Sequence, residues 1–225
     1  MRTLLVIFLS LTLFASVFAP HANGATKNAE DTKAIAQAKE WFDKATKYSA
    51  ERKDDLAISA YSKALEIYPQ FVEAYSGRGS VLVRSGRSEQ ALDDFNRAIA
   101  LDRKNAPALN NRGMVLYSRG AYDRAVEDFS NALKISPANA VYHANRAAAY
   151  IKLKQYEKAA VDYSDAIADD SKNGDTFAGR GAAYYSMGKT EQARVDFDRA
   201  CSLGSDSGCR SFKMVSNIKL SSAGT

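Results

Sequence analysis

Histidine and cysteine are scarce in this chain, and their scarcity excludes most catalytic and metal-binding arrangements. The 225 residues include two histidines and two cysteines. His21 lies close to the N-terminus, so His143 is the one histidine left for the body of the chain. Zinc sites built from pairs of ligands, and Ser-His-Asp sites built around a nucleophile elbow, need more than this. We therefore predict a protein that is not an enzyme and that holds no metal or cofactor.

Long apolar runs are also scarce, with one exception at the N-terminus. Residues 4–18 form a nearly unbroken apolar run behind a positively charged start, and Ala22 and Gly24 are the small residues that a signal peptidase requires. We expect residues 1–24 to be a signal peptide that is cleaved before Ala25, which predicts an exported protein in the periplasm or outside the cell. The alternative is an uncleaved membrane anchor, although the run is short for a transmembrane span.

Charge is not concentrated in any one block of the chain. The net charge at neutral pH is +5, and 25% of the residues are charged. Basic and acidic residues alternate along the sequence, a pattern typical of a solvated protein surface. We expect no nucleic-acid partner and, once the signal is removed, no integral membrane span.

The dominant feature is a 34-residue period that continues through five copies without insertion or deletion. A large aromatic residue marks one position of the period: Tyr61, Phe95, Phe129, Tyr163 and Phe197. Alanine marks another: Ala64, Ala98, Ala132, Ala166 and Ala200. Each period contains two stretches with apolar residues at helical spacing, separated by a break such as Gly120. The period predicts stacked helix pairs in an all-α solenoid, whose function depends on a surface more than on a pocket.

The period also sets the expected boundaries along the chain. Residues 25–37 are expected to lead into the first helix. The five repeats are then expected at 38–71, 72–105, 106–139, 140–173 and 174–207. Residues 208–225 are expected to hold a capping helix and a flexible tail, with the helix itself over about 206–220. Phe212 and Val215 are available there to cover the open face of the last repeat.

Two charged positions recur with the period and are both absent from the first copy. Arginine recurs on the first helix of each pair: Arg78, Arg112, Arg146 and Arg180. Aspartate recurs on the second helix: Asp94, Asp128, Asp162 and Asp196. The first copy has Lys44 and Ala60 instead. Because the two positions lie about level in an antiparallel pair, we predict a ladder of Arg–Asp ion pairs; an anion-binding stripe of arginines is the alternative.

At these offsets the chain resembles the tetratricopeptide repeat. The third copy shows the pattern most fully, with Leu109, Gly113, Leu116, Ala125, Phe129, Ala132 and Pro137. The resemblance covers about residues 38–207, although the closing proline is absent from copies two, four and five. It implies a right-handed α-solenoid in which the first helix of each pair lines a concave inner wall. It also implies a protein or peptide partner that lies on that wall as an extended segment or a helix.

Carried over by position, the resemblance places a set of non-repeating residues on the inner wall. They are Asn110, Asn111, Met114 and Tyr117 in copy three, Asn145, Ala148, Ile151 and Lys152 in copy four, and Ala182 and Tyr185 in copy five. The asparagines can hydrogen-bond the backbone of a ligand whatever its side chains, and the tyrosines and Met114 offer adaptable apolar contact. The alternative is that these are ordinary solvated residues of a helix.

Two more specific sites, a catalytic or ligand-binding histidine and a carboxylate clamp, lack the residues that they need. His143 stands where sister copies have Trp41, Leu109 and Phe177, so we expect it to pack between helices and not to act as a general base or a ligand. Chaperone-binding members of the family clamp a C-terminal carboxylate with basic residues and two asparagines. Asn111 and Asn145 match the asparagines, but Pro107 stands where a lysine is needed. We therefore expect no carboxylate clamp.

The last segment of the chain carries both cysteines. Residues 200–204, with Gly208 and Cys209, are similar to the Sel1-like, cysteine-containing repeats of exported bacterial proteins. That resemblance implies a disulfide between Cys201 and Cys209 that joins the capping helix to the last repeat. An exported protein lies where disulfides persist. Two buried free thiols are the alternative.

Taken together, these features predict an exported scaffold or adaptor, with the bacterial periplasm as its setting. It would bind a protein or peptide on its concave surface and assist the assembly of a cell-envelope complex. The alternative is a structural solenoid that associates with itself into homo-oligomers. The sequence does not name the partner.

Overall fold

The structure is a computed structural model that describes residues 22–222, so most of the expected signal peptide lies outside the described residues. Over this range the chain forms eleven α-helices and no strand. The helices are α1 (Ala22–Ala50), α2 (Asp54–Ile67), α3 (Val72–Arg84), α4 (Ser88–Leu101), α5 (Ala106–Ser118), α6 (Tyr122–Ile135), α7 (Ala140–Lys152), α8 (Tyr156–Asp169), α9 (Gly174–Ser186), α10 (Thr190–Ser202) and α11 (Asp206–Ser222).

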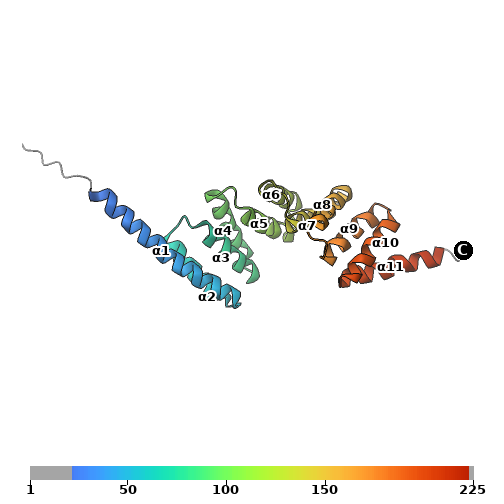
Figure 1. Ribbon diagram of the computed structural model, residues 1–225, viewed down its shortest axis with the longest axis horizontal. Coiled ribbons are helices and arrows are strands. Elements are labelled where there is room, and N and C mark those ends of the chain that lie inside the picture. Colours follow the sequence, from blue (N-terminus) through green and yellow to red (C-terminus); the bar gives the residue numbers. More distant parts are fainter. Residues whose placement is uncertain (1–21, 223–225) are drawn as a thin grey trace, which may run out of the picture.

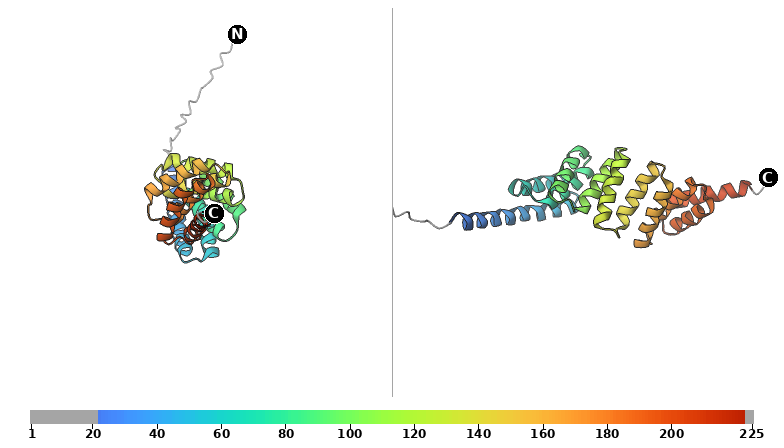
Figure 2. Two further views of the ribbon diagram at one scale, coloured as in Figure 1. Left: turned by 90° about the vertical axis from the view of Figure 1, so that its right-hand side faces the viewer. Right: turned by 90° about the horizontal axis from the view of Figure 1, so that it is seen from above.

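Consecutive helices pack in pairs, and the pairs succeed one another along one direction (Figure 1). The first pair is α1 with α2, the last is α9 with α10, and α11 packs on the last pair. The helices α1 and α11 lie at opposite ends of the molecule, and each extends beyond the stacked pairs (Figure 2). The expected all-α solenoid of repeated helix pairs is confirmed. None of the described helices combines the length and the apolar character that a membrane crossing requires.

The repeated aromatic and alanine positions form the core of each pair. Phe95 and Phe129 are fully buried, and the alanines beside them, such as Ala98 and Ala132, have no exposed surface. Alanine lets the neighbouring helix approach closely, while the ring fills the space between helices. Burial of each ring stabilises its repeat by roughly 1.5–3 kcal/mol.

The turn inside each pair requires a left-handed backbone, which explains the recurrent glycine. Gly120 has a φ of 78°, and the matching turn of the fourth copy places Lys154 at a φ of 58°. Glycine adopts this conformation without the steric cost that a Cβ brings. Lys154 therefore holds its turn under strain that the surrounding helices must offset.

The N-terminal boundary differs from the sequence-based expectation. Residues 25–37 do not lead into a helix that begins at 38; they are part of α1, which begins at Ala22. The reason is local, because no glycine or proline interrupts residues 25–50 and alanine, lysine and glutamate favour helix. At the other end α11 begins at Asp206, and its Val215 is buried against Phe197 and Phe212.

Candidate binding surface on the inner wall

Each recurrent arginine lies against the recurrent aspartate of its own repeat. In the third repeat, Arg112 Nε and Nη2 donate to the two carboxylate oxygens of Asp128 at 2.8 and 2.7 Å. Three other pairs have the same two-pronged geometry: Arg78 with Asp94, Arg146 with Asp162, and Arg180 with Asp196. The aspartate raises the pKa of its arginine through these hydrogen bonds. With every arginine neutralised in this way, the arginines do not form an anion-binding stripe.

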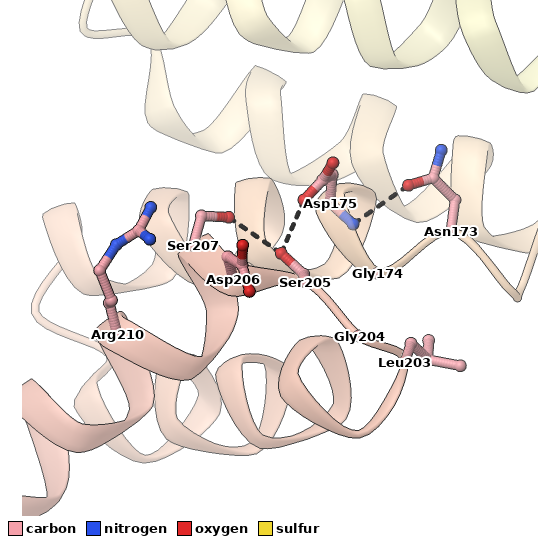
Figure 3. A pocket seen from close by; sticks show the side chains of 9 residues that line it. All are labelled: Asn173, Gly174, Asp175, Leu203, Gly204, Ser205, Asp206, Ser207 and Arg210. Carbon is pink, nitrogen blue, oxygen red and sulfur yellow. Dashed lines mark hydrogen bonds between the residues drawn. The ribbon is translucent and has the colours of Figure 1, made fainter.

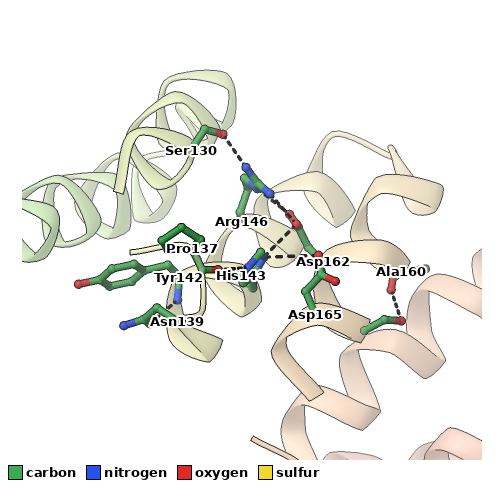
Figure 4. Close-up of polar contacts among 10 residues, drawn as sticks. Ser130, Pro137, Asn139, Tyr142, His143, Arg146, Ala160, Asp162 and Asp165 are labelled. Carbon is green, nitrogen blue, oxygen red and sulfur yellow. Dashed lines mark hydrogen bonds and ion pairs between the residues drawn. The ribbon is translucent and has the colours of Figure 1, made fainter. Parts of the chain in front are cut away.

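The remaining nitrogen of each of these arginines, Nη1, connects its repeat to the repeat before it. Arg146 Nη1 donates to Ser130 Oγ of α6 at 3.1 Å while its other nitrogens bind Asp162 of α8 (Figure 4). The equivalent acceptors in the other repeats are Ser62, Asn96 and Ser164. The pairs therefore join three successive helices, which accounts for their recurrence without a ligand. The sequence analysis did not identify these acceptors, although they too recur every 34 residues.

The recurrent aromatic ring packs against a small residue of a first helix in two different ways. In the second and third repeats the ring is phenylalanine, its own first helix has glycine and the next repeat has asparagine, as with Gly113, Phe129 and Asn145. A Cβ built on Gly113 would lie 2.7 Å from the Phe129 ring. Phe95 follows the same rule with Gly79 and Asn111.

Where the ring is tyrosine, its own first helix has alanine, and the glycine lies on the first helix of the next repeat. Tyr163 has Ala147 on its own first helix and Gly179 on the next, and Tyr61 likewise has Ala45 and Gly77. A Cβ built on Gly179 would lie 2.4 Å from Tyr163 Cζ and 2.7 Å from its hydroxyl. The tyrosine hydroxyl therefore occupies the space into which an asparagine side chain projects in other repeats. Each of these four junctions between repeats therefore holds one polar group in this space, an amide or a hydroxyl.

Tyr163 is the member of this set with an unused hydrogen-bonding group. Only 8% of the residue is exposed, and burial raises the pKa of its hydroxyl to about 12. Among the residues that the structure describes, none hydrogen-bonds this hydroxyl. The Tyr61 hydroxyl, by contrast, lies 3.4 Å from Thr46 Oγ1.

The asparagines form a chain across three repeats. Asn145 Nδ2 donates to Asn110 Oδ1 at 2.9 Å, Asn110 Nδ2 donates to Asn111 Oδ1 at 3.2 Å, and Asn111 Nδ2 donates to Ser80 Oγ at 3.1 Å. Asn110 is only 7% exposed. Contrary to the sequence-based expectation, it is therefore an internal brace that positions its neighbours and does not face a ligand. Asn111 and Asn145 are half-buried and remain accessible.

An apolar column lies beside these polar groups, at one recurrent position of α3, α5, α7 and α9. Its members are Val83, Tyr117, Ile151 and Tyr185. Val83 and Tyr185 are 40% and 39% exposed, and Met114 nearby is 42% exposed. The sequence analysis missed Val83, although its distance from Tyr117 is one period. A cleft of about 160 Å³ opens between α3 and α5, lined by Ser80, Val83, Phe95, Asn111 and Met114.

The remaining expected wall residues differ in accessibility. Lys152, at the end of α7, is exposed, whereas Ala148 and Ala182 are half-buried between neighbouring helices. The wall thus combines accessible amides and an apolar column with few free charges. Arg84 also belongs to these helices, but its guanidinium is paired with Asp54 of α2.

The comparison with known families decides what kind of repeat this is. Three overlapping segments, residues 42–106, 76–140 and 111–176, match the sequence profile of the tetratricopeptide repeat. The chain belongs to the tetratricopeptide repeat family. The matched segments end before Cys201, so the likeness of the C-terminal segment to Sel1-like repeats stays a prediction. A search of curated proteins found no match.

Solved tetratricopeptide repeat structures share the fold. PilF of Pseudomonas aeruginosa is 18% identical with a TM-score of 0.73, and the match covers 85% of this chain and 90% of PilF. YrrB, described as a TPR protein with an unusual peptide-binding site, is 21% identical with a TM-score of 0.68, over 84% of this chain and 98% of YrrB. MamA is 21% identical with a TM-score of 0.67, over 74% and 91%. These identities establish the fold alone.

A polar cleft lies at the C-terminal end of the tetratricopeptide repeats, next to the start of α11 (Figure 3). Its volume is about 410 Å³, and it lies where α9 and α11 begin. Ser205 Oγ donates to Asp175 Oδ1 at 2.6 Å and accepts from the Gly208 backbone N–H at 3.2 Å. Cys201 of α10 and Cys209 of α11 lie at disulfide distance, with their Cα atoms 4.4 Å apart. These contacts hold the cap on the last repeat, and the acids in the cleft disfavour an anionic ligand.

Proposed function

We propose that this tetratricopeptide repeat protein is a scaffold that binds a segment of a partner protein along its inner wall. The observation that carries the proposal is the presence of accessible asparagine amides beside an apolar position that recurs in four repeats. Asn111 and Asn145 are accessible and can each hydrogen-bond a partner's backbone. Val83, Tyr117, Ile151 and Tyr185 can receive its apolar side chains.

The chemistry of the wall favours an uncharged partner segment. Lys152 is an exposed charge on the wall, whereas the nearby arginines are neutralised by aspartates. A strongly acidic or basic segment would lose hydration without finding opposite charges. YrrB, which shares the fold, has a peptide-binding site. A segment with small polar and apolar residues would suit this wall best.

We propose further that the protein acts outside the cytosol, in the bacterial periplasm, where it helps to assemble an envelope complex. The N-terminal sequence with the features of a signal peptide supports export. The Cys201–Cys209 disulfide supports an oxidising compartment, since such bonds are rare in the cytosol.

Affinity capture with the full-length, exported protein tests the proposal. A variant with Asn111→Ala, Ile151→Ala and Tyr185→Ala removes accessible groups of the wall. A matched control, Val161→Ser with Val195→Ser, changes exposed residues of α8 and α10. The proposal expects one protein to be captured by the wild type and the control but lost from the wall variant. Equal capture by all three forms would move binding off the inner wall.

Self-association is the second candidate, because the two ends of the solenoid each expose an apolar residue. Ile35 on α1 is 46% exposed, and Met214 on α11 is 47% exposed. Contacts between such ends would produce dimers or longer arrays. Light scattering separates the candidates. A mass that stays monomeric over a wide concentration range removes self-association.

A further inference from the structure

The fourth repeat differs from the other repeats at two facing positions, one on its first helix and one on its second. In the first repeat, Lys63 of the second helix lies over the Trp41 ring of the first helix, 4.4 Å from the ring centre. In the fifth repeat, Arg199 takes the same place at 5.9 Å from the centre of the Phe177 ring. The fourth repeat has an imidazole and an acid at these positions, His143 and Asp165. An acid occurs at this second-helix position in no other repeat: Lys63, Arg97, Asn131 and Arg199.

The orientation of His143 identifies which nitrogen is available. Its Nε2 lies 2.8 Å from the carbonyl oxygen of Pro137 (Figure 4). A carbonyl oxygen can only accept, so Nε2 carries a hydrogen and donates it. Nδ1 lies 3.3 Å from Asp162 Oδ1 and 3.8 Å from Asp165 Oδ2. Nδ1 of this tautomer is an acceptor that faces two carboxylate oxygens. Asp162 Oδ1 also accepts from Arg146 Nη2 at 2.7 Å, whereas no donor of the described residues lies between Nδ1 and Asp165 Oδ2, so this side of the cluster can take a cation.

From this arrangement we propose a divalent transition-metal site formed by His143 Nδ1, Asp162 Oδ1 and Asp165 Oδ2. These three atoms lie within 4.8 Å of one another. Bonds of 2.0–2.1 Å in a tetrahedral site place neighbouring ligand atoms about 3.3 Å apart. This is the distance from His143 Nδ1 to Asp162 Oδ1, whereas Asp165 Oδ2 lies farther from Nδ1, at 3.8 Å. The Asp165 side chain is 53% exposed, which leaves a path from solvent and room for water ligands. This inference revises the sequence-based expectation that the chain holds no metal.

The surroundings of the ligands support such a site and indicate its preferred ion. The Pro137 carbonyl orients the imidazole through the nitrogen that faces away from the ion, as is usual for metal-binding histidines. Asp162 is held by Arg146, which in turn binds Ser130. A nitrogen ligand favours zinc, cobalt or nickel over magnesium and calcium, which prefer oxygen alone. The positive charge of Arg146 weakens the affinity, so binding should be reversible. The bound ion would connect α7 with α8.

The test is a titration of the untagged, full-length protein with Co²⁺, followed by its visible absorption, and with Zn²⁺, followed by thermal unfolding. The fourth repeat can be given the residues of the third, Leu109 and Asn131, through His143→Leu and Asp165→Asn. Asp165 is exposed, so the second variant keeps the fold. Asp93→Asn, an exposed acid of α4, is the matched control.

The proposal expects Co²⁺ absorption that saturates at one ion per chain and a melting temperature that rises with Zn²⁺. Both effects should disappear in His143→Leu and in Asp165→Asn and persist in Asp93→Asn. No saturable binding would overturn the proposal. Binding that survives both single variants would overturn it as well, because the ion would then lie elsewhere.

Discussion

The ring of Tyr163 occupies the space that a side chain at position 179 would need. A Cβ on Gly179 would lie 2.4 Å from Tyr163 Cζ, closer than real carbon atoms approach. On the first helix of its own repeat, Tyr163 packs against Ala147, whereas the phenylalanine repeats have glycine at that position. The alanine Cβ takes space beside the ring, so the Tyr163 ring lies closer to position 179. Position 179 is therefore coupled to the identity of residues in the preceding repeat.

This coupling predicts a rescue by substitution. Gly179→Asn alone should lower the free energy of unfolding by about 1–3 kcal/mol, because the amide overpacks against the Tyr163 ring. Adding Ala147→Gly and Tyr163→Phe recreates the combination of Gly113, Phe129 and Asn145, so the triple variant should recover most of that loss. Denaturant unfolding of the single, double and triple variants measures the coupling. Purely additive effects would show that the rings and small positions do not share this space.

Removal of one partner of an ion pair should be costly. The Asp128 side chain is 4% exposed, and that of Arg112 is 25% exposed. Arg112→Ala leaves a buried carboxylate unpaired and should cost about 3–5 kcal/mol, whereas Asp128→Ala leaves an arginine that can turn to water and should cost about 2–3 kcal/mol. A double-mutant cycle on thermal or denaturant unfolding gives their coupling. A coupling energy near zero would contradict a structural role for the pairs.

The disulfide should stabilise the cap. Cys201 and Cys209 are separated by 8 residues, and a closed loop of that length lowers the entropy of the unfolded chain by the equivalent of about 2.5 kcal/mol. Replacing both cysteines with serine should cost about that amount, and reduction of the wild type should have the same effect. Hydrogen exchange should show the loss first in α11. Unchanged exchange in α11 after reduction would show that packing of Val215 alone holds the cap.

The buried Tyr163 hydroxyl predicts a loss of stability at high pH. Burial raises its pKa from 10.0 to about 12, so the folded state prefers the neutral phenol. Its contribution is fully present below about pH 10 and is lost as the pH rises through about 12, because the unfolded chain ionises first. Tyr163→Phe should remove roughly 2–3 kcal/mol of this dependence. Identical pH profiles of unfolding for wild type and Tyr163→Phe would indicate a solvated hydroxyl.

The fold could be predicted from sequence because five copies report the same pattern. A departure from the pattern at one position, such as Lys154 in place of the turn glycine, does not change the prediction, because other copies have the expected residue. Residues outside the period lack this support, and there the prediction placed the start of α1 too late. Helix propensity, the remaining local signal, favoured the earlier start.

The site was less predictable because burial on the wall depends on the neighbouring repeat. Asn110 and Asn111 are adjacent in sequence and chemically identical, yet Asn110 is enclosed by the next repeat through Asn145. Tyr163 is a core residue by its pattern, and only the distance to Gly179 reveals that its hydroxyl fills the space of a side chain on the next repeat. The contacts of His143 with two acids likewise depend on a helix that follows it in the chain.

The most direct test of the central claim is site-specific photo-crosslinking in cells, with a photoreactive residue in place of Met114 on the inner wall or Val195 on α10. Both positions are exposed, at 42% and 56%. The account predicts one discrete crosslinked partner protein from position 114 and none from position 195. A partner crosslinked only from position 195, or a product that contains only a second copy of this chain, would contradict it.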